Sequence, residues 1–125
     1  MQNDKQKVLV VEDDEFLLEL YSTKLKMEGF QVFSAGDGER GLRLAKEKKP
    51  DLVLLDIVLP KIDGLEVLRK LKKDGETAYI PIVLLTNLSQ KDEVSEGLKA
   101  GAEDYLIKAH FMPSEVVDKI KKILQ

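Results

Sequence analysis

The sequence contains no cysteine. This absence excludes a disulfide framework, a cysteine-bound zinc ion and a thiol nucleophile, and it is typical of proteins from reducing compartments. The sequence also has no long apolar run: a stretch such as Leu52–Leu55 is far shorter than the ~20 residues that span a bilayer. No basic segment followed by an apolar run comes after Met1, so no secretion signal is predicted. We therefore expect a cytoplasmic protein without a membrane partner.

The charge balance does not favour nucleic acid either. The 20 basic and 23 acidic side chains give a net charge of −3, whereas nucleic-acid-binding domains usually present a strongly basic face. Direct nucleic-acid binding is therefore not predicted. The lysines do gather in three clusters, within segments that we expect to be helical. Solvated helix faces are the simpler interpretation of these clusters and a phosphate-binding patch is the alternative. The clusters are Lys46, Lys48 and Lys49; Lys70, Lys72 and Lys73; and Lys119, Lys121 and Lys122.

The length of 125 residues and the hydrophobic content of 43% are typical of one globular domain. We expect a single domain over residues 1–125, with the polar segment 1–6 disordered. Five short apolar segments, several of them rich in β-branched residues, predict strands. Those rich in Val, Leu and Ile lack polar alternation, as is typical of parallel strands covered on both faces. The predicted strands are Lys7–Val11, Gln31–Ser34, Leu52–Leu55, Ile80–Leu85 and Tyr105–Ile107.

A segment with helical periodicity follows each predicted strand. The first should present an inner stripe and end at Gly29, the second should span Asp37–Lys48, and the third should end near Gly75. The fourth, Lys91–Lys99, is weakly amphipathic, and Pro113 should open the fifth. The expected inner residues are Phe16, Leu17, Leu20, Tyr21 and Leu25; Leu65, Leu68 and Leu71; Val94 and Leu98; and Val116, Val117, Ile120, Ile123 and Leu124.

Five strand–helix units predict an α/β fold with parallel pairing and right-handed crossovers. Five units are too few for an eight-stranded barrel. The remaining architecture is an open (βα)5 sheet of the flavodoxin-like type, with strand order 2-1-3-4-5 and helices on both faces. Ligands of such sheets bind outside the carboxyl ends of the strands, where the strand order reverses.

The residues that leave the predicted strands are therefore the candidate site. Glu12, Asp13 and Asp14 follow the first strand, Asp56 the third, Thr86 the fourth and Lys108 the fifth. Each has a simple structural alternative: an aspartate can cap a helix, Thr86 can be a strand residue and Lys108 can be solvated. Asp56 is the hardest to dismiss, because a carboxylate within an apolar run is costly unless it is bound.

Clustered carboxylates repel one another and are held together best by a hard cation with oxygen ligands. One or two carboxylates, waters and a phosphate oxygen are the usual ligands of Mg²⁺. A carboxylate beside such an ion can act as a nucleophile towards phosphorus. An ammonium and a hydroxyl, here Lys108 and Thr86, suit the charge that develops on the phosphoryl oxygens.

Two other patterns carry less weight. Residues 36–41 read G-x-G-x-x-G after a strand, but this strand should lie at the sheet edge, and Asp37 and Glu39 would repel a pyrophosphate. A turn and a helix start explain these glycines. His110 is the only histidine, and an ordinary loop residue is the simpler interpretation.

Five motifs in order make the sequence resemble the response-regulator receiver domains of two-component signalling. They are Val-Leu-Val-Val-Glu-Asp-Asp at 8–14, Asp-Leu-Val-Leu-Leu-Asp at 51–56, Leu-Pro-Lys-Ile-Asp-Gly at 59–64, Pro-Ile-Val-Leu-Leu-Thr at 81–86 and Gly-Ala-Glu-Asp-Tyr-Leu-Ile-Lys at 101–108.

The resemblance implies that Asp56 accepts a phosphoryl group from a phosphohistidine of a sensor kinase or phosphotransfer protein. It implies a Mg²⁺ site formed by Asp13, by Glu12 through water, by Asp56 and by the backbone carbonyl of Val58. Asp14 would cap a helix.

The resemblance also implies that Thr86 and Lys108 bind the phosphoryl oxygens. Tyr105 would turn inwards when Thr86 moves, which would change the face formed by the fourth helix, fifth strand and fifth helix. Any catalysis would then be limited to the protein's own phosphorylation and dephosphorylation, in a monomer or a phosphorylation-linked dimer.

Two departures from the family pattern matter. Ala109 replaces the proline that usually follows the active-site lysine, and a cis bond to a non-proline costs ~3 kcal/mol, so the path of the chain at Lys108 is left open. Asn87 stands where the family prefers a small residue, and Leu88 follows it. Together with the apolar Val58 they predict a poorly positioned attacking water and a long-lived phosphoryl group.

Two further functions are alternatives to a phosphorylation switch. One is a Mg²⁺-dependent phosphohydrolase and the other is a scaffold that works without phosphorylation. Neither the kinase nor the downstream target, which could be a separate protein or a fused output domain, follows from the sequence. Charge crowding also predicts that Asp56→Asn or Asp13→Asn stabilises the metal-free protein.

Overall fold

The computed structural model describes residues 5–87, 89–108 and 112–125. Its centre is a parallel five-stranded sheet in the order β2-β1-β3-β4-β5, as predicted. Each strand starts and ends within two residues of its expected bounds. β4 begins after Pro81, which has no N–H to donate to a neighbouring strand. The strands are β1 (Lys7–Val11), β2 (Gln31–Ala35), β3 (Leu52–Asp56), β4 (Ile82–Thr86) and β5 (Asp104–Ile107).

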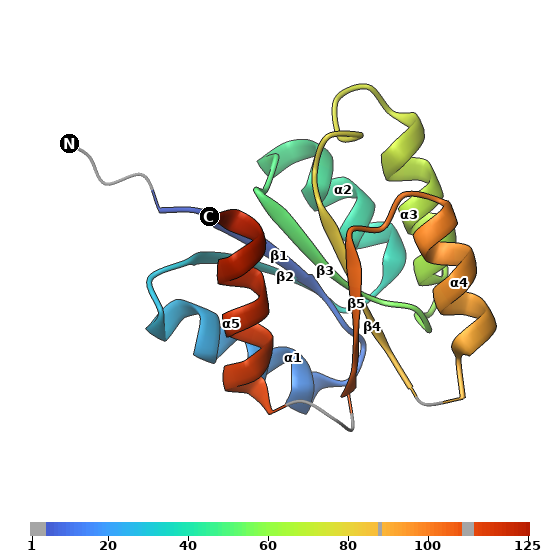
Figure 1. Ribbon diagram of the computed structural model, residues 1–125. Helices are drawn as coiled ribbons and strands as arrows, with labels where there is room; N and C mark the ends of the chain where they lie inside the picture. The colour runs from blue at the N-terminus through green and yellow to red at the C-terminus, as the bar shows by residue number, and fades with distance from the viewer. Residues whose placement is uncertain (1–4, 88, 109–111) are drawn as a thin grey trace.

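Five helices cover the two faces of the sheet (Figure 1). α1 and α5 pack side by side on one face, and α2, α3 and α4 lie on the other. The helices are α1 (Glu15–Met27), α2 (Gly38–Lys48), α3 (Gly64–Lys73), α4 (Lys91–Lys99) and α5 (Pro113–Leu124). None of the helices in the described part of the chain is long and apolar enough to cross a membrane.

Aspartates fix the start of three helices. Asp14, Asp37 and Asp63 precede α1, α2 and α3, and each carboxylate accepts a hydrogen bond from a backbone N–H in the first turn, at distances of 3.0, 2.8 and 3.1 Å. Such caps satisfy N–H groups that have no partner within the helix. The predicted capping role of Asp14 is confirmed.

The core has two layers, one on each face of the sheet. One layer joins β1, β3 and β4 to α2 and α3, and the other joins the opposite faces of the same strands to α1 and α5. β3 and β4 are buried along their whole length, as expected for strands covered on both faces. The sheet is thus a rigid platform for the residues that follow its carboxyl ends.

Two predicted inner residues are on the surface. Phe16 is 73% exposed, because it lies two positions from the packed Leu18, and residues two apart point to nearly opposite sides of a helix. Leu98 is 41% exposed, because Gly97 instead faces the sheet. A Cβ added to Gly97 would lie 2.4 Å from Leu84 Cδ1, so α4 approaches β4 through its backbone at this residue.

Two of the three glycines of the G-x-G-x-x-G pattern, Gly38 and Gly41, have packing roles, and β2 is an edge strand as predicted. A Cβ on Gly38 would lie 1.9 Å from the carbonyl oxygen of Ile62, and one on Gly41 would lie 3.0 Å from the side chain of Val11. The close approach of α2 to the loop before α3 and to β1 therefore explains these two glycines without a nucleotide.

Candidate functional site

The carboxyl ends of β1, β3, β4 and β5 bring together the predicted site residues. Asp56 and Thr86 are the last residues of β3 and β4, and Glu12 and Lys108 directly follow β1 and β5. Parallel pairing sets Val11 beside Leu55, and Asp56 beside Leu85, so the strands end at one edge of the sheet. Glu12, Asp56 and Thr86 are each at most 5% exposed.

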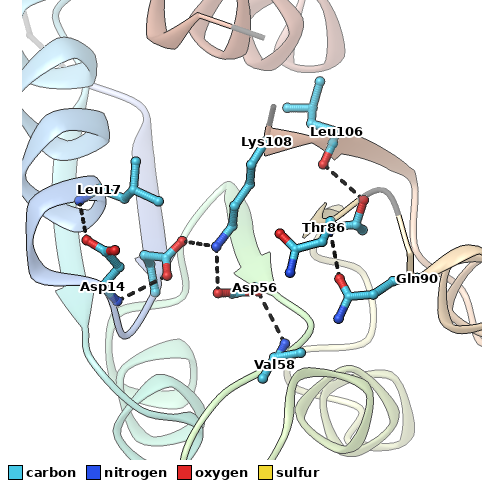
Figure 2. Close-up of polar contacts among 10 residues, drawn as sticks. Asp14, Leu17, Asp56, Val58, Thr86, Gln90, Leu106 and Lys108 are labelled. Carbon is cyan, nitrogen blue, oxygen red and sulfur yellow. Dashed lines mark hydrogen bonds and ion pairs between the residues drawn. The ribbon is translucent and has the colours of Figure 1, made fainter. Parts of the chain in front are cut away.

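Lys108 connects the carboxylates of β1 and β3. Its ammonium nitrogen lies 2.7 Å from Glu12 Oε1 and 2.8 Å from Asp56 Oδ2. Figure 2 shows the Lys108 side chain reaching towards Asp56 from the end of β5. Burial lowers the pKa of Lys108, but its contacts with Asp56 and Glu12 outweigh this effect, so its pKa lies above its ordinary value. Lys108 is therefore a fixed positive charge in the site.

Glu12 is the most buried acid of the site. Burial raises its pKa from 4.5 to about 7; Lys108 lowers this pKa and the neighbouring Asp56 raises it. Oε2 accepts a hydrogen bond of 3.1 Å from the Asp14 N–H, whereas Oε1 is buried and accepts no aligned hydrogen bond, although Lys108 is in ion-pair contact with it. Lys108 is therefore the charged partner of Glu12 Oε1.

Three carboxylates converge here. One oxygen from each of Glu12, Asp13 and Asp56 lies within 4.8 Å of the others, and Asp13 is exposed while the other two are buried. Carboxylate oxygens are the preferred ligands of Mg²⁺. The convergence of these oxygens, a donor set made of carboxylates alone, fits a small divalent cation bound next to Asp56.

The loop after β3 is held tightly around Asp56. The Val58 N–H donates a hydrogen bond of 3.2 Å to Asp56 Oδ1, as Figure 2 shows. The Gly64 N–H donates one of 2.7 Å to the Ile57 carbonyl, and a Cβ on Gly64 would lie only 2.0 Å from the Asp56 carbonyl oxygen. Only glycine therefore fits there. No role was predicted for Gly64 from the sequence. The dipeptide Asp63-Gly64, just before a segment with helical periodicity, is a turn signal that could have identified it.

Thr86 and Tyr105 lie near each other on β4 and β5. The Thr86 hydroxyl donates a weak hydrogen bond of 3.4 Å to the Leu106 carbonyl (Figure 2), and Tyr105 is 37% exposed. Both line a cavity of about 370 Å³ beside α4, whose lining also includes Val94 and Leu98. Tyr105 is therefore outward in this structure, next to a space on the α4–β5 side.

Gln90 belongs to the same region and was missed by the sequence reasoning. It is 8% exposed, and its Oε1 accepts a hydrogen bond of 2.7 Å from the Asn87 N–H. This bond joins the residue that follows β4 to the residue that precedes α4. An isolated glutamine before a helix has no distinctive sequence pattern.

Three predictions concern residues outside the described ranges. They are the conformation of the Lys108–Ala109 bond, the effect of Leu88 on access to the site, and the loop position of His110.

Comparisons with known proteins agree with this geometry. The model of the response regulator receiver domain family matches residues 8–121. The chain is 39% identical over 119 residues to the DNA-binding dual master transcriptional regulator RpaA of Synechocystis, covering 95% of this chain and 49% of that protein. It is 40% identical over 119 residues to the alkaline phosphatase synthesis transcriptional regulatory protein PhoP of Bacillus subtilis, covering 95% and 48%.

A similar solved structure is that of a putative response regulator from Chloroflexus aurantiacus. Its TM-score is 0.89 and its identity 33%, and the match covers 97% of this chain and 98% of that one. The chain spans about half the length of the curated relatives it matches.

The chain therefore belongs to the response regulator receiver domain family of two-component systems. Receiver domains of this family accept a phosphoryl group on an aspartate, bind Mg²⁺ through an acidic cluster, and interact with histidine kinases or phosphotransfer proteins.

Proposed function

We propose that Asp56 is the phosphoryl acceptor of this chain and that the whole chain, residues 1–125, works as one cytoplasmic receiver domain. The observation that carries this assignment is the contact between Asp56 and Lys108, two charged side chains brought from β3 and β5 to one edge of the sheet. The donor would be a phosphohistidine of a sensor histidine kinase or phosphotransfer protein.

The proposed Mg²⁺ ligands are Glu12 through water, Asp13, Asp56 and the backbone carbonyl of Val58. The three carboxylates are already close to one another, and the Val58 N–H is hydrogen-bonded to Asp56. When bound, the ion would neutralise these acids and polarise the phosphoryl oxygens. The raised pKa of Glu12 implies that a cation would displace a proton from this carboxyl near neutral pH.

In the proposed reaction an oxygen of the Asp56 carboxylate forms a bond to phosphorus while the bond from phosphorus to the donor's imidazole nitrogen breaks. The electron pair of that bond stays on the imidazole. Lys108 would exchange its contact with Asp56 for a phosphoryl oxygen, and the Thr86 hydroxyl would bind another. Positioning and charge stabilisation are the main contributions that a protein makes to phosphoryl transfer.

Thr86 would then couple the acceptor to the surface. Its hydroxyl has only a long bond to the Leu106 carbonyl to give up, and the cavity beside α4 offers space for the Tyr105 ring. Inward movement of both side chains would alter the α4–β5–α5 face and the binding of downstream partners, either as a monomer or as a phosphorylation-linked dimer. The relative RpaA is a DNA-binding regulator, and we propose that the domain described here does not itself contact DNA.

Incubation with Mg²⁺ and acetyl phosphate, followed by intact-protein mass spectrometry, tests this function. We expect one hydroxylamine-labile phosphoryl group per chain, which Asp56→Asn abolishes. Asp37→Asn is the control, because asparagine can still cap α2. Many turnovers of donor per chain would instead identify a phosphohydrolase. Absence of label from the folded wild-type protein would identify a scaffold that works without phosphorylation.

A further inference from the structure

A groove between α2 and α3 joins two of the three lysine clusters seen in the sequence. It lies on the outer side of these helices, has a volume of about 610 Å³, and is lined by Arg43 and Lys46 from α2 and by Lys70 and Lys73 from α3. Leu42, half-buried against the core, adds an apolar side chain to this lining. The two helices pack against each other (Figure 1), and the groove is lined from both.

Helical spacing explains this convergence. Lys46 follows Leu42 by four residues and Arg43 by three, and Lys73 follows Lys70 by three, so each helix presents these side chains on one side. The neighbouring Lys48 and Lys72 point elsewhere: the first lies over the Phe33 ring and the second donates to backbone carbonyls near the start of β4. The charges of Lys48 and Lys72 are therefore used elsewhere in the fold and do not contribute to the groove.

The charges of the two helices contrast with those of the whole chain. α2 has four basic and two acidic side chains and α3 has four basic and one acidic, whereas the chain is net negative. Lys46 pairs with Asp74 at 3.3 Å, Arg43 with Glu39 at 3.9 Å and Lys70 with Glu66 at 3.8 Å. All three basic side chains remain more than half exposed, and such surface pairs are weak and easily exchanged.

Stabilisation of helix ends accounts for only part of this arrangement. Basic residues in the last turn interact favourably with the helix dipole wherever they lie around the helix axis. That effect does not require the basic residues of two helices to face a common groove. Arg43 also precedes the last turn of α2, so its position in the groove has no explanation from the dipole.

We propose that the α2–α3 groove is a second docking surface, which binds an acidic segment of a partner protein. The groove supplies four cations and the partly exposed side chain of Leu42, a combination that complements carboxylates interleaved with an apolar side chain. α2 has eleven residues and is about 16 Å long, so the groove accommodates two to three turns of a helix.

A polyphosphate fits this groove less well. The carboxylates of Glu39 and Asp74 are among its lining residues and would repel an unbroken row of phosphates. Proteins that grip duplex DNA electrostatically commonly neutralise about 6–10 phosphates, more than four partly paired cations can neutralise. A peptide avoids this conflict, because its own sequence can leave the positions opposite the two acids uncharged.

The test is an NMR titration of the isotope-labelled full chain with a synthetic peptide of three Glu-Glu-Leu repeats. We expect amide shifts within 42–46 and 70–73, and binding that weakens as salt is added. The variant Arg43→Gln/Lys70→Gln/Lys73→Gln should raise the Kd about tenfold. The matched control Lys26→Gln/Lys121→Gln/Lys122→Gln removes the same charge from other surfaces and should leave the Kd unchanged.

Three results would overturn the proposal: no shifts in the groove, an equal loss of binding in the control variant, or a stronger response to duplex DNA or phosphatidylserine vesicles than to the peptide. Both triple variants leave the acidic site intact and should still accept a phosphoryl group from acetyl phosphate. Failure of the groove proposal is therefore distinguishable from failure of the proposed function.

Discussion

The ammonium nitrogen of Lys108 lies 2.8 Å from Oδ2 of Asp56, although the two residues are 52 positions apart in the sequence. The same nitrogen contacts Glu12, so one cation is shared by two buried carboxylates. Asp13 adds a third carboxylate nearby. The metal-free site therefore carries more negative than positive charge, and charge substitutions at Asp56 and Lys108 should change stability in opposite directions.

Asp56→Asn should stabilise the metal-free protein. The substitution removes a buried carboxylate that repels Glu12, while Lys108 keeps its contact with Glu12. We expect the free energy of unfolding to rise by about 1–2 kcal/mol, since an incompletely compensated buried charge is costly. Asp13→Asn should also raise the free energy of unfolding, but by a smaller amount, because Asp13 is exposed. Urea denaturation in the presence of EDTA measures both.

Lys108→Ala is the opposing control. It leaves the two buried carboxylates of Glu12 and Asp56 without their cation and should lower the free energy of unfolding by about 3 kcal/mol. Protonation of Glu12 offsets part of a larger loss. If Asp56→Asn and Lys108→Ala both destabilise the metal-free protein, the carboxylates are not crowded and the site is better described as a balanced ion-pair network.

Periodicity and strand ends were sufficient to predict the sheet, its order and the residues at its carboxyl edge. The buried strands are apolar throughout, and the order 2-1-3-4-5 then places Glu12, Asp56, Thr86 and Lys108 together. Asp14 was predictable as a cap because aspartate before a helical pattern has a local structural cause.

The errors arose where packing rather than local pattern decides. Phe16 and Leu98 are apolar and nearly fit the helical spacing of the inner residues. Whether their side chains point to the core depends on how each helix is rotated against the sheet, and both are exposed. Gly64 depends on a close backbone approach to Asp56, and Gln90 on the direction of its side chain towards Asn87. Neither feature has a distinctive pattern in the sequence. The groove between α2 and α3 was visible only as two separate lysine clusters, because its cations come from different helices.

Magnesium should stabilise the wild-type protein by mass action. At a concentration one hundred times its Kd, a ligand that binds only the folded state adds ~2.7 kcal/mol to the free energy of unfolding. This gain should be largely lost in Asp13→Asn, which removes the exposed carboxylate of the cluster. Asp14→Asn is the matched control, because asparagine retains the cap of α1. An equal magnesium response in both variants would exclude Asp13 as a ligand.

The phosphoryl group should be long-lived. The Val58 side chain is 55% exposed and adjoins Asp56 through the Val58 N–H, yet it has no polar group that orients an attacking water. We expect label on Asp56 to persist for minutes after the donor is removed, and Val58→Asn to shorten this lifetime several-fold. The label is followed by intact-protein mass spectrometry. Loss of the wild-type label within seconds would contradict the prediction.

The stability of the metal-free protein should fall as the pH rises from 5 to 7.5. The pKa of Glu12 is about 7 in the folded protein and 4.5 without the fold, so between these values the folded state binds more protons. The contribution of Glu12 to the free energy of unfolding is complete below pH 4.5 and is lost as the pH rises through 7. A carboxylate whose pKa is lowered by folding shows the opposite pH dependence. At ~1.4 kcal/mol for each pKa unit, the loss is about 3 kcal/mol.

Urea denaturation in EDTA at several pH values measures this slope, and Glu12→Gln is the variant that should flatten it. Lys108 does not contribute within this window, because its raised pKa keeps it protonated. Asp37 and Asp74 stay ionised in it, because backbone hydrogen bonds from Arg40 and Glu76 lower their pKa values. A slope that persists in Glu12→Gln would assign the titration to another group. A wild-type stability that rises with pH over this range would contradict the burial of a protonated Glu12.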